Sequence, residues 1–209
     1  MKIYINDHSS IRIKDKLTVW FDPFLLKNEP HDADVIFITH SHHDHFSPED
    51  IAKAANEGTL FVLPACMRGA EKVPENALFV EPGDGLDVLG LRVSVLPAYN
   101  IGKRFHPREN GFAAYVVSFK GGTVFVAGDA DLTPEAEAIK CDIALLPCGG
   151  KYTMNESEAA ALANRIKPRV AIPTHYGAVA GDKDSGGRFC ALLGDGIRGL
   201  DIMGTETEI

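Results

Sequence analysis

Three kinds of signal are missing from this 209-residue sequence. None of its four cysteines belongs to a Cys-x-x-Cys pair, so the sequence does not indicate a disulfide framework, and we expect reduced thiols. The first ten residues lack the apolar core of a signal peptide. No apolar run approaches the roughly 20 residues that span a membrane. We therefore expect a cytoplasmic protein with no membrane partner.

Positive charge is scarce as well. The chain has 21 Lys and Arg residues against 29 Asp and Glu residues, which gives a formal net charge of −8. An acidic surface repels phosphate backbones, so we expect no nucleic-acid partner. A small anionic substrate stays compatible with this charge, because bound metal ions would dominate the electric field inside a site.

The length and composition are those of an ordinary globular protein. Hydrophobic residues make up 45% of the chain and charged residues 24%, and a chain of this length can bury a sizeable core. No linker or low-complexity tract divides the sequence, so we expect one domain over residues 1–209.

The hydrophobic pattern predicts strands in the first two thirds of the chain and alternating strands and helices in the last third. Runs of β-branched and aromatic residues predict strands at 2–5, 10–14, 17–21, 34–39, 60–63, 78–80, 90–97, 112–119, 123–127, 142–146 and 169–173. A helix is expected over 48–56, because Ser47 can cap it and Gly58 would end it. Another is expected up to residue 166, behind the capping box of Asn155 and Glu158. The segment 98–111 has no periodicity and is expected to be a loop.

Two of the predicted strands end in the same dipeptide. DVIFITH at 34–40 and RVAIPTH at 169–175 are both apolar runs that close with Thr-His. Two such halves, built from mixed strands and helices, favour an α/β sandwich with its site at the ends of strands.

Six consecutive residues carry the strongest chemical signal. The run His40-Ser-His-His-Asp-His45 lies between a predicted buried strand and a predicted capped helix. Residues two apart in an extended chain face the same side, so His40 and His42 can approach one metal ion. Asp44 and His45 follow where the chain turns and can reach a second ion, whereas His43 points away. Imidazole nitrogens and carboxylate oxygens suit zinc, iron and manganese.

A surface histidine tract that binds metal adventitiously is the alternative interpretation of this run. Four histidines and an aspartate within six positions, at the end of a strand, favour a built site over such a tract. Later in the chain, Asp129 follows a predicted strand and His175 ends another. Taken alone, each is equally well explained as a turn residue or a structural histidine.

The pattern His-x-His-x-Asp-His in THSHHDH resembles the signature of the metallo-β-lactamase superfamily, and further matches extend over most of the chain. They are His8-Ser9-Ser10, the segment WFDP at 20–23, Ala127-Gly128-Asp129, and PTHYG at 173–177. The stretch LLPCGGKYTM at 145–154 is similar to one in the branch that includes ascorbate-6-phosphate lactonase.

This resemblance implies an αββα sandwich and a metal-dependent hydrolase with two metal positions bridged by Asp129. The ligands are then His40 and His42 at the first position, and Asp44, His45 and His175 at the second. Asp44 and Asp129 would be catalytic residues. A metal-bound hydroxide would be the nucleophile, since a divalent cation lowers the pKa of bound water towards about 7. One or two divalent ions per chain are expected, with zinc first and manganese or iron as alternatives.

The sequence departs from the superfamily at one position. The third histidine of the first metal position is expected after Leu96-Pro97-Ala98, where this chain has Tyr99-Asn100. Asn100 could ligate through its oxygen, His106 could fold back from the loop as the ligand, or the first position could be weak or absent. We favour His106 as the third ligand.

Other residues are expected beside the metals. Asp22 and His8 are candidates to support the ligands, because metal-bound imidazoles usually donate their other N–H to a carboxylate or carbonyl. The candidates for contact with the substrate are Lys103, Arg104, Arg108 and Tyr152. Cations beside a metal site could clamp a phosphate or carboxylate, whereas a solvated loop with ordinary charges is the alternative.

The expected reaction is hydrolysis of a small-molecule ester, lactone or phosphoester. The superfamily also contains nucleases, dioxygenases and di-iron redox proteins, so the fold alone does not decide the reaction. A non-catalytic metal-binding or sensing protein and a di-iron redox protein are the alternatives. The intact set of convergent ligands favours catalysis.

Overall fold

The computed structural model describes all 209 residues and contains two seven-stranded sheets packed face to face. The first sheet has the strand order β14-β1-β2-β3-β4-β5-β6 and the second β13-β12-β11-β10-β9-β8-β7. The strands of the first sheet are β1 (Lys2–Ile5), β2 (Ile11–Lys14), β3 (Thr18–Phe21), β4 (Ala33–Phe37), β5 (Ala55–Pro64), β6 (Ala77–Val80) and β14 (Glu206–Glu208). Those of the second are β7 (Gly85–Val88), β8 (Leu91–Pro97), β9 (Ala113–Phe119), β10 (Gly122–Val126), β11 (Ile143–Pro147), β12 (Val170–Thr174) and β13 (Arg198–Gly199).

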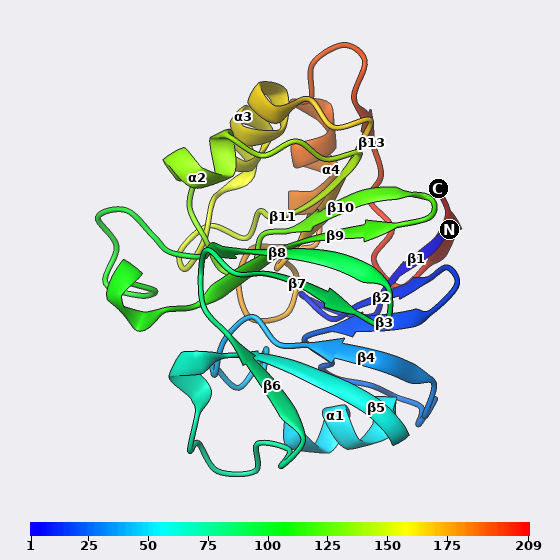
Figure 1. The fold of residues 1–209 in the computed structure, drawn as a ribbon. Helices are drawn as coiled ribbons and strands as arrows, with labels where there is room; N and C mark the ends of the chain where they lie inside the picture. Colours follow the sequence, from blue (N-terminus) through cyan, green and yellow to red (C-terminus); the bar gives the residue numbers. More distant parts are fainter.

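Helices cover the outer face of each sheet (Figure 1). Helix α1 (Pro48–Ala54) lies against the first sheet, and the other helices lie together on the second. These are α2 (Pro134–Glu137), α3 (Glu156–Ile166) and α4 (Ser185–Ala191), and two 3-10 turns, η1 (Ala65–Met67) and η2 (Arg108–Asn110), lie in the connections. The four layers confirm the predicted αββα sandwich. None of its helices has the length and apolar character needed to cross a lipid bilayer.

Three buried clusters correspond to the three interfaces between these layers. The largest lies between the sheets, where Phe21 and Phe37 stack with ring centroids 5.1 Å apart beside Tyr115. A second cluster fills the space beneath α3 and α4, and a third lies beneath α1 around Trp20. Alternate residues of β2 are buried, as expected for a strand with one face in the core.

The structure corrects the predicted end of the first helix. Ser47 caps α1 as predicted, but the helix ends at Ala54 and the next residue begins β5, so Gly58 lies within a strand. The Asn56 amide donates to the Ala33 carbonyl at the start of β4. Residues 55 and 56 therefore pair with β4 as part of β5, although their local sequence also allows a helix.

Five short elements were not predicted from the sequence, namely α2, α4, β7, β13 and β14. Helix α4 contains Gly186 and Gly187, and glycine disfavours helix. The fold requires the first of them, because a Cβ on Gly186 would lie only 2.6 Å from the Tyr176 hydroxyl. Tertiary packing thus fixes this helix against its local propensity.

The parallel strands bring three segments to one end of the sandwich. In the first sheet β4 runs parallel to β3 and β5, and in the second β10, β11 and β12 run parallel to one another. His40 follows β4, Asp129 follows β10 and His175 follows β12. Because the carboxyl ends of parallel strands share an edge, these side chains meet there.

Candidate metal centre

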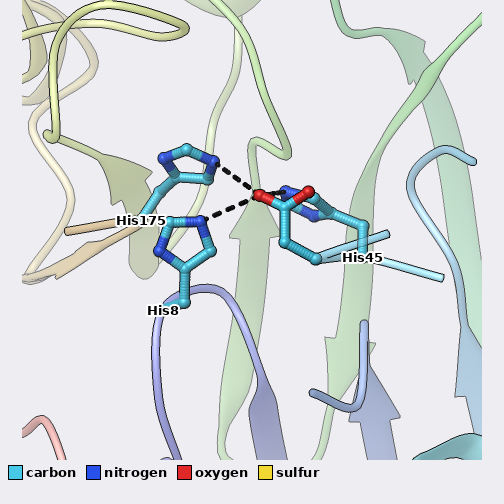
Figure 2. Close-up of side chains that lie close together, drawn as sticks. His8, His45 and His175 are labelled. Carbon is cyan, nitrogen blue, oxygen red and sulfur yellow. Dashed lines mark hydrogen bonds and ion pairs between the residues drawn. The ribbon is translucent and has the colours of Figure 1, made fainter. Parts of the chain in front are cut away.

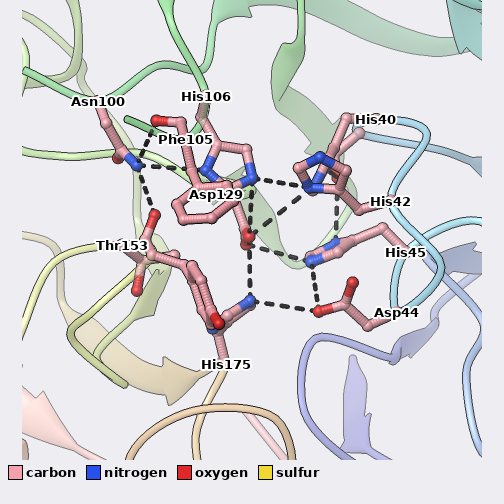
Figure 3. Close-up of polar contacts among 12 residues, drawn as sticks. His40, His42, Asp44, His45, Asn100, Phe105, His106, Asp129, Thr153 and His175 are labelled. Atoms are coloured by element: carbon pink, nitrogen blue, oxygen red, sulfur yellow. Dashed lines mark hydrogen bonds and ion pairs between the residues drawn. The ribbon is translucent and has the colours of Figure 1, made fainter. Parts of the chain in front are cut away.

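His40, His42 and His106 form a cluster that we call the histidine trio. Nδ1 of His42 lies 3.1 Å from Nε2 of His40 and 3.0 Å from Nε2 of His106. Each pair of rings meets edge to face, with centroids 4.7 to 5.0 Å apart. Figure 3 shows the three rings turned toward one another. The structure thus brings His106, from the loop after β8, beside the two histidines that follow β4.

His8, Asp44, His45 and His175 form a second cluster, the acidic cluster. Oδ2 of Asp44 lies 3.2 Å from Nε2 of His8 and 3.7 Å from Nε2 of both His45 and His175. Figure 2 shows the rings of His8 and His175 side by side and facing His45. The sequence suggested His8 as a supporting residue, whereas the structure places its Nε2 among the donor atoms themselves.

Asp129 lies between the two clusters. Its Oδ2 is 3.0 Å from Nε2 of His175 and 3.4 Å from Nε2 of His106, and its Oδ1 is 3.2 Å from Nε2 of His45. The preceding residue, Gly128, has a φ of 61° and approaches Thr39 so closely that a Cβ there would lie 3.1 Å from the Cβ of Thr39. A glycine at this turn therefore lets the carboxylate reach the end of β4.

Asp22 holds His45 from behind. Its Oδ2 is 2.7 Å from Nδ1 of His45, and the same carboxylate accepts hydrogen bonds from the hydroxyl and backbone N–H of Thr39. With Nδ1 donating to Asp22, the opposite nitrogen of His45 is left facing Asp129 and Asp44. This is the arrangement by which carboxylates orient metal-binding imidazoles.

Burial and charge give His45 a different protonation state from the histidine trio. Burial lowers the pKa of His40 well below its ordinary value and also lowers those of His42 and His106. Burial opposes protonation of His45 too, but Asp129 and Asp22 outweigh it and hold the pKa of His45 well above its usual range. The trio is therefore neutral near pH 7, whereas His45 carries a proton when no metal is bound.

The donor atoms fit metal ions. Nε2 of His45, Nε2 of His175 and Oδ1 of Asp129 are buried and make no hydrogen bond, although buried polar atoms nearly always have a partner. Two ligands that each lie about 2.1 Å from one ion are about 3.0 to 3.4 Å apart for right-angle to tetrahedral geometry. The separations of 3.0 and 3.1 Å within the trio and of 3.0 Å between His175 and Asp129 fall in this range, whereas the 3.7 Å between His175 and Asp44 is slightly longer.

A family model of the beta-lactamase superfamily domain matches residues 2–175 of the chain. The chain belongs to this superfamily. A metal-dependent hydrolase from Methanosphaera stadtmanae is 31% identical over 228 aligned positions, which cover 99% of this chain and 95% of the relative. Another from Methanopyrus kandleri is 30% identical over 194 positions, covering 85% of this chain and 84% of the relative.

Solved structures agree with the superfamily assignment. A candidate metal-dependent hydrolase from Parabacteroides distasonis has a TM-score of 0.81 at 28% identity, covering 97% of this chain and 92% of that one. A metallo hydrolase from Ignicoccus hospitalis, at 22% identity and a TM-score of 0.78, covers 100% of this chain and 98% of that one and shares the fold. The predictions of the superfamily and of a metal-dependent hydrolase are confirmed, and the branch that includes ascorbate-6-phosphate lactonase stays a prediction.

Asn100 lies behind His106, on the side away from His40 in Figure 3. Its amide nitrogen donates to the carbonyls of Phe105 and Tyr152 and lies 3.2 Å from Nδ1 of His106. Its backbone N–H donates to the carbonyl of His106 at 2.8 Å, and His106 has a φ of 58°. His106, and not Asn100, therefore lies beside His40 and His42, and Asn100 closes the loop that carries His106.

The structure does not support the predicted basic clamp. Lys103 pairs with Asp131 and donates to the Thr153 carbonyl at 2.6 Å, and Arg108 pairs with Glu135 and lies over the Tyr99 ring. Arg104 is exposed. The cavity above the metal centre has a volume of about 220 Å³ and no lysine or arginine in its lining. Two of the basic residues proposed to contact the substrate, Lys103 and Arg108, are thus paired with carboxylates of the protein itself.

Of the four predicted substrate contacts, only Tyr152 lines this cavity. Phe105 and Val179 line it as well, and neither was predicted. The position of Phe105 next to His106 is the signal that could have found it. Val179 has no comparable signal, because it lies in the irregular segment between β12 and α4.

Proposed function

We propose that the protein hydrolyses a small-molecule ester, lactone or phosphoester with one or two divalent metal ions. The first ion would be held by the histidine trio and Asp129, and the second by Asp44, His45, His175 and the same Asp129. Zinc suits this donor set best, and manganese or iron would also accept it.

One observation supports the proposal above all others. Two clusters of donors, all buried except the half-buried His42, meet at a shared carboxylate, Asp129, directly beneath an open cavity. Two-metal sites with a shared ligand are suited to hydrolysis, because both the attacking water and the leaving group need charge stabilisation. A site that only stores metal does not need a cavity above it.

The residues around the cavity have separate tasks in this proposal. Bound divalent ions would supply a water of lowered pKa and polarise the attacked carbonyl or phosphoryl oxygen. Asp22 keeps the proton of His45 on Nδ1. Asp44 and Asp129 are the carboxylates of the cavity lining, and we assign them to orient the attacking water by accepting its hydrogen bonds.

The test combines metal content with turnover. Protein purified without a histidine tag or chelator is analysed by elemental mass spectrometry, together with His42→Ala and His175→Ala, and assayed on a panel of esters, lactones and phosphodiesters. We expect about two metals per chain in the natural protein, one in each variant, and turnover only with both. Fully loaded protein that turns over no member of the panel would refute the hydrolase and favour a metal-binding protein.

A further inference from the structure

Three side chains with large apolar surfaces line the cavity above the metal centre, and we call them the wall. Phe105 comes from the loop after β8, Tyr152 from the loop after β11, and Val179 from the loop after β12. Phe105 and Val179 keep 43% and 38% of their surface exposed. Large apolar side chains exposed at the mouth of a cavity are available to a ligand.

Hydrogen bonds and ring contacts fix the Phe105 and Tyr152 part of the wall. The Asn100 amide donates to the Phe105 carbonyl at 3.1 Å and to the Tyr152 carbonyl, so one side chain ties together the two loops that carry the rings. The rings of Phe105 and Tyr152 meet edge to face, with centroids 5.0 Å apart at 85°. Figure 3 shows Phe105 close to His106 and Asn100. The contact surface is therefore preorganised beside the histidine trio.

The loop after β8 also carries basic residues, but two of them form ion pairs that fix the loop. Lys103 binds Asp131 and the Thr153 carbonyl, which fixes the loop to the segment that follows Tyr152. Arg108 binds Glu135 and the hydroxyl of Tyr99. No lysine or arginine lines the cavity to meet an anionic substituent. Apart from its histidines, its carboxylates and the Tyr152 hydroxyl, the cavity offers apolar contact.

We propose that Phe105, Tyr152 and Val179 form a binding subsite for the apolar acyl group of an uncharged ester or lactone. This inference rests on the proposed hydrolase function and narrows its substrate class. In the reaction, the oxygen of water bonds to the carbonyl carbon and the carbon–oxygen ester bond breaks. One proton of that water goes to the departing alcohol oxygen, and the other leaves with the acid. The apolar chain would lie against the wall while the carbonyl carbon faces the water that Asp44 and Asp129 orient.

The experiment measures kcat/KM of the metal-loaded protein for p-nitrophenyl acetate, butyrate and hexanoate, and for the matched anionic adipate monoester. Each methylene that the wall buries increases kcat/KM by up to about 4-fold, the ratio equivalent to about 0.8 kcal/mol. We expect at least about a 10-fold rise from acetate to hexanoate, and the adipate monoester below the hexanoate.

Two variants from different loops probe the wall. In metal-loaded protein, Phe105→Ala and Val179→Ala should each flatten the rise of kcat/KM from acetate to hexanoate. Leu89→Ala is the matched control, because Leu89 is 52% exposed in the turn between β7 and β8, away from the cavity. It should leave the chain-length dependence unchanged. If Phe105→Ala loses metal through its neighbour His106, Val179→Ala still tests the wall.

The outcomes separate this inference from the proposed function. Ester turnover that is flat with chain length, or that favours the adipate monoester, would overturn the apolar subsite and leave the hydrolase intact. An undiminished rise with chain length in both wall variants would overturn it too. No turnover of any ester with metal fully loaded would instead overturn the hydrolase proposal, and the subsite with it.

Discussion

The two donor clusters of the metal centre are built in different ways. The acidic cluster has a carboxylate of its own in Asp44, and Asp22 and Thr39 hold His45 from behind. The histidine trio has only neutral imidazoles apart from the shared Asp129, and His106 reaches it from 64 residues further along the chain than His42. Charge and prior orientation both favour a cation in the acidic cluster. Two sites that share one ligand therefore need not bind metal equally tightly.

Removal of His106 should change the metal content and the turnover more than any other substitution. His106→Ala should lose one metal equivalent from the trio, keep the ion of the acidic cluster, and lower turnover by more than about 100-fold, because even supporting residues cost about 10- to 100-fold. Elemental mass spectrometry and the ester assay measure the two effects. His31→Ala is the matched control, since the His31 side chain is 53% exposed just before β4 and does not line the cavity. Unchanged metal stoichiometry and affinity in His106→Ala would rule out the ligand role.

Asp22→Asn should affect the opposite cluster, with a smaller effect. An amide cannot hold the Nδ1 proton of His45 as a carboxylate does, so metal affinity of the acidic cluster should fall about 10- to 100-fold while the trio is unaffected. Chelator competition measures both affinities. Asp34→Asn is a suitable control. Asp34, near the start of β4, accepts a backbone hydrogen bond from Thr18 at the start of β3, and this end of the strands is far from the metals. Equal losses at both clusters would point to a general packing defect.

The smallest expected effect is a difference in pH dependence. Because the pKa of His45 is held well above its ordinary value, metal must displace a proton there. Affinity of the acidic cluster should therefore rise up to about 10-fold per pH unit, until pH passes the pKa of His45. The pKa values of the trio are lowered, so its affinity should be nearly constant from about pH 7 upward. Metal titrations at pH 6, 7 and 8 would expose the difference, and parallel slopes for the two clusters would contradict it.

The parts of the metal centre that could be predicted from sequence directly follow predicted strands. His40 to His45 follow one strand directly, and Asp129 and His175 each follow another, so strand order alone is enough to bring them together. His106 could only be offered as one of three alternatives. Its place depends on a loop closed by Asn100 and on a positive φ, and neither leaves a periodic signal.

The basic residues of the loop after β8 show a second limit of prediction from sequence. On sequence, Lys103 and Arg108 are candidates for substrate contact because they are basic and near the ligands, with a solvated loop as the alternative. Their partners Asp131 and Glu135 lie 28 and 27 residues away, so their pairing is visible only once the chain is folded. The short strand β14 at the sheet edge and the glycine-rich α4 were missed for the same reason, because tertiary contacts rather than local pattern define them.

The contacts that hold the cavity wall also bear on how such a protein can change over time. Asn100 fixes the loop of Phe105 through backbone carbonyls, and Lys103 fixes it through Asp131 and another carbonyl, so these ties do not depend on which side chain stands at 105. Most proposed ligands, in contrast, sit where strands end. A lineage can therefore replace residue 105 or 179 and acquire a different substrate preference while its reaction centre is inherited unchanged. Within relatives of this chain, we expect divergence in specificity to be recorded in the loops after β8 and β12.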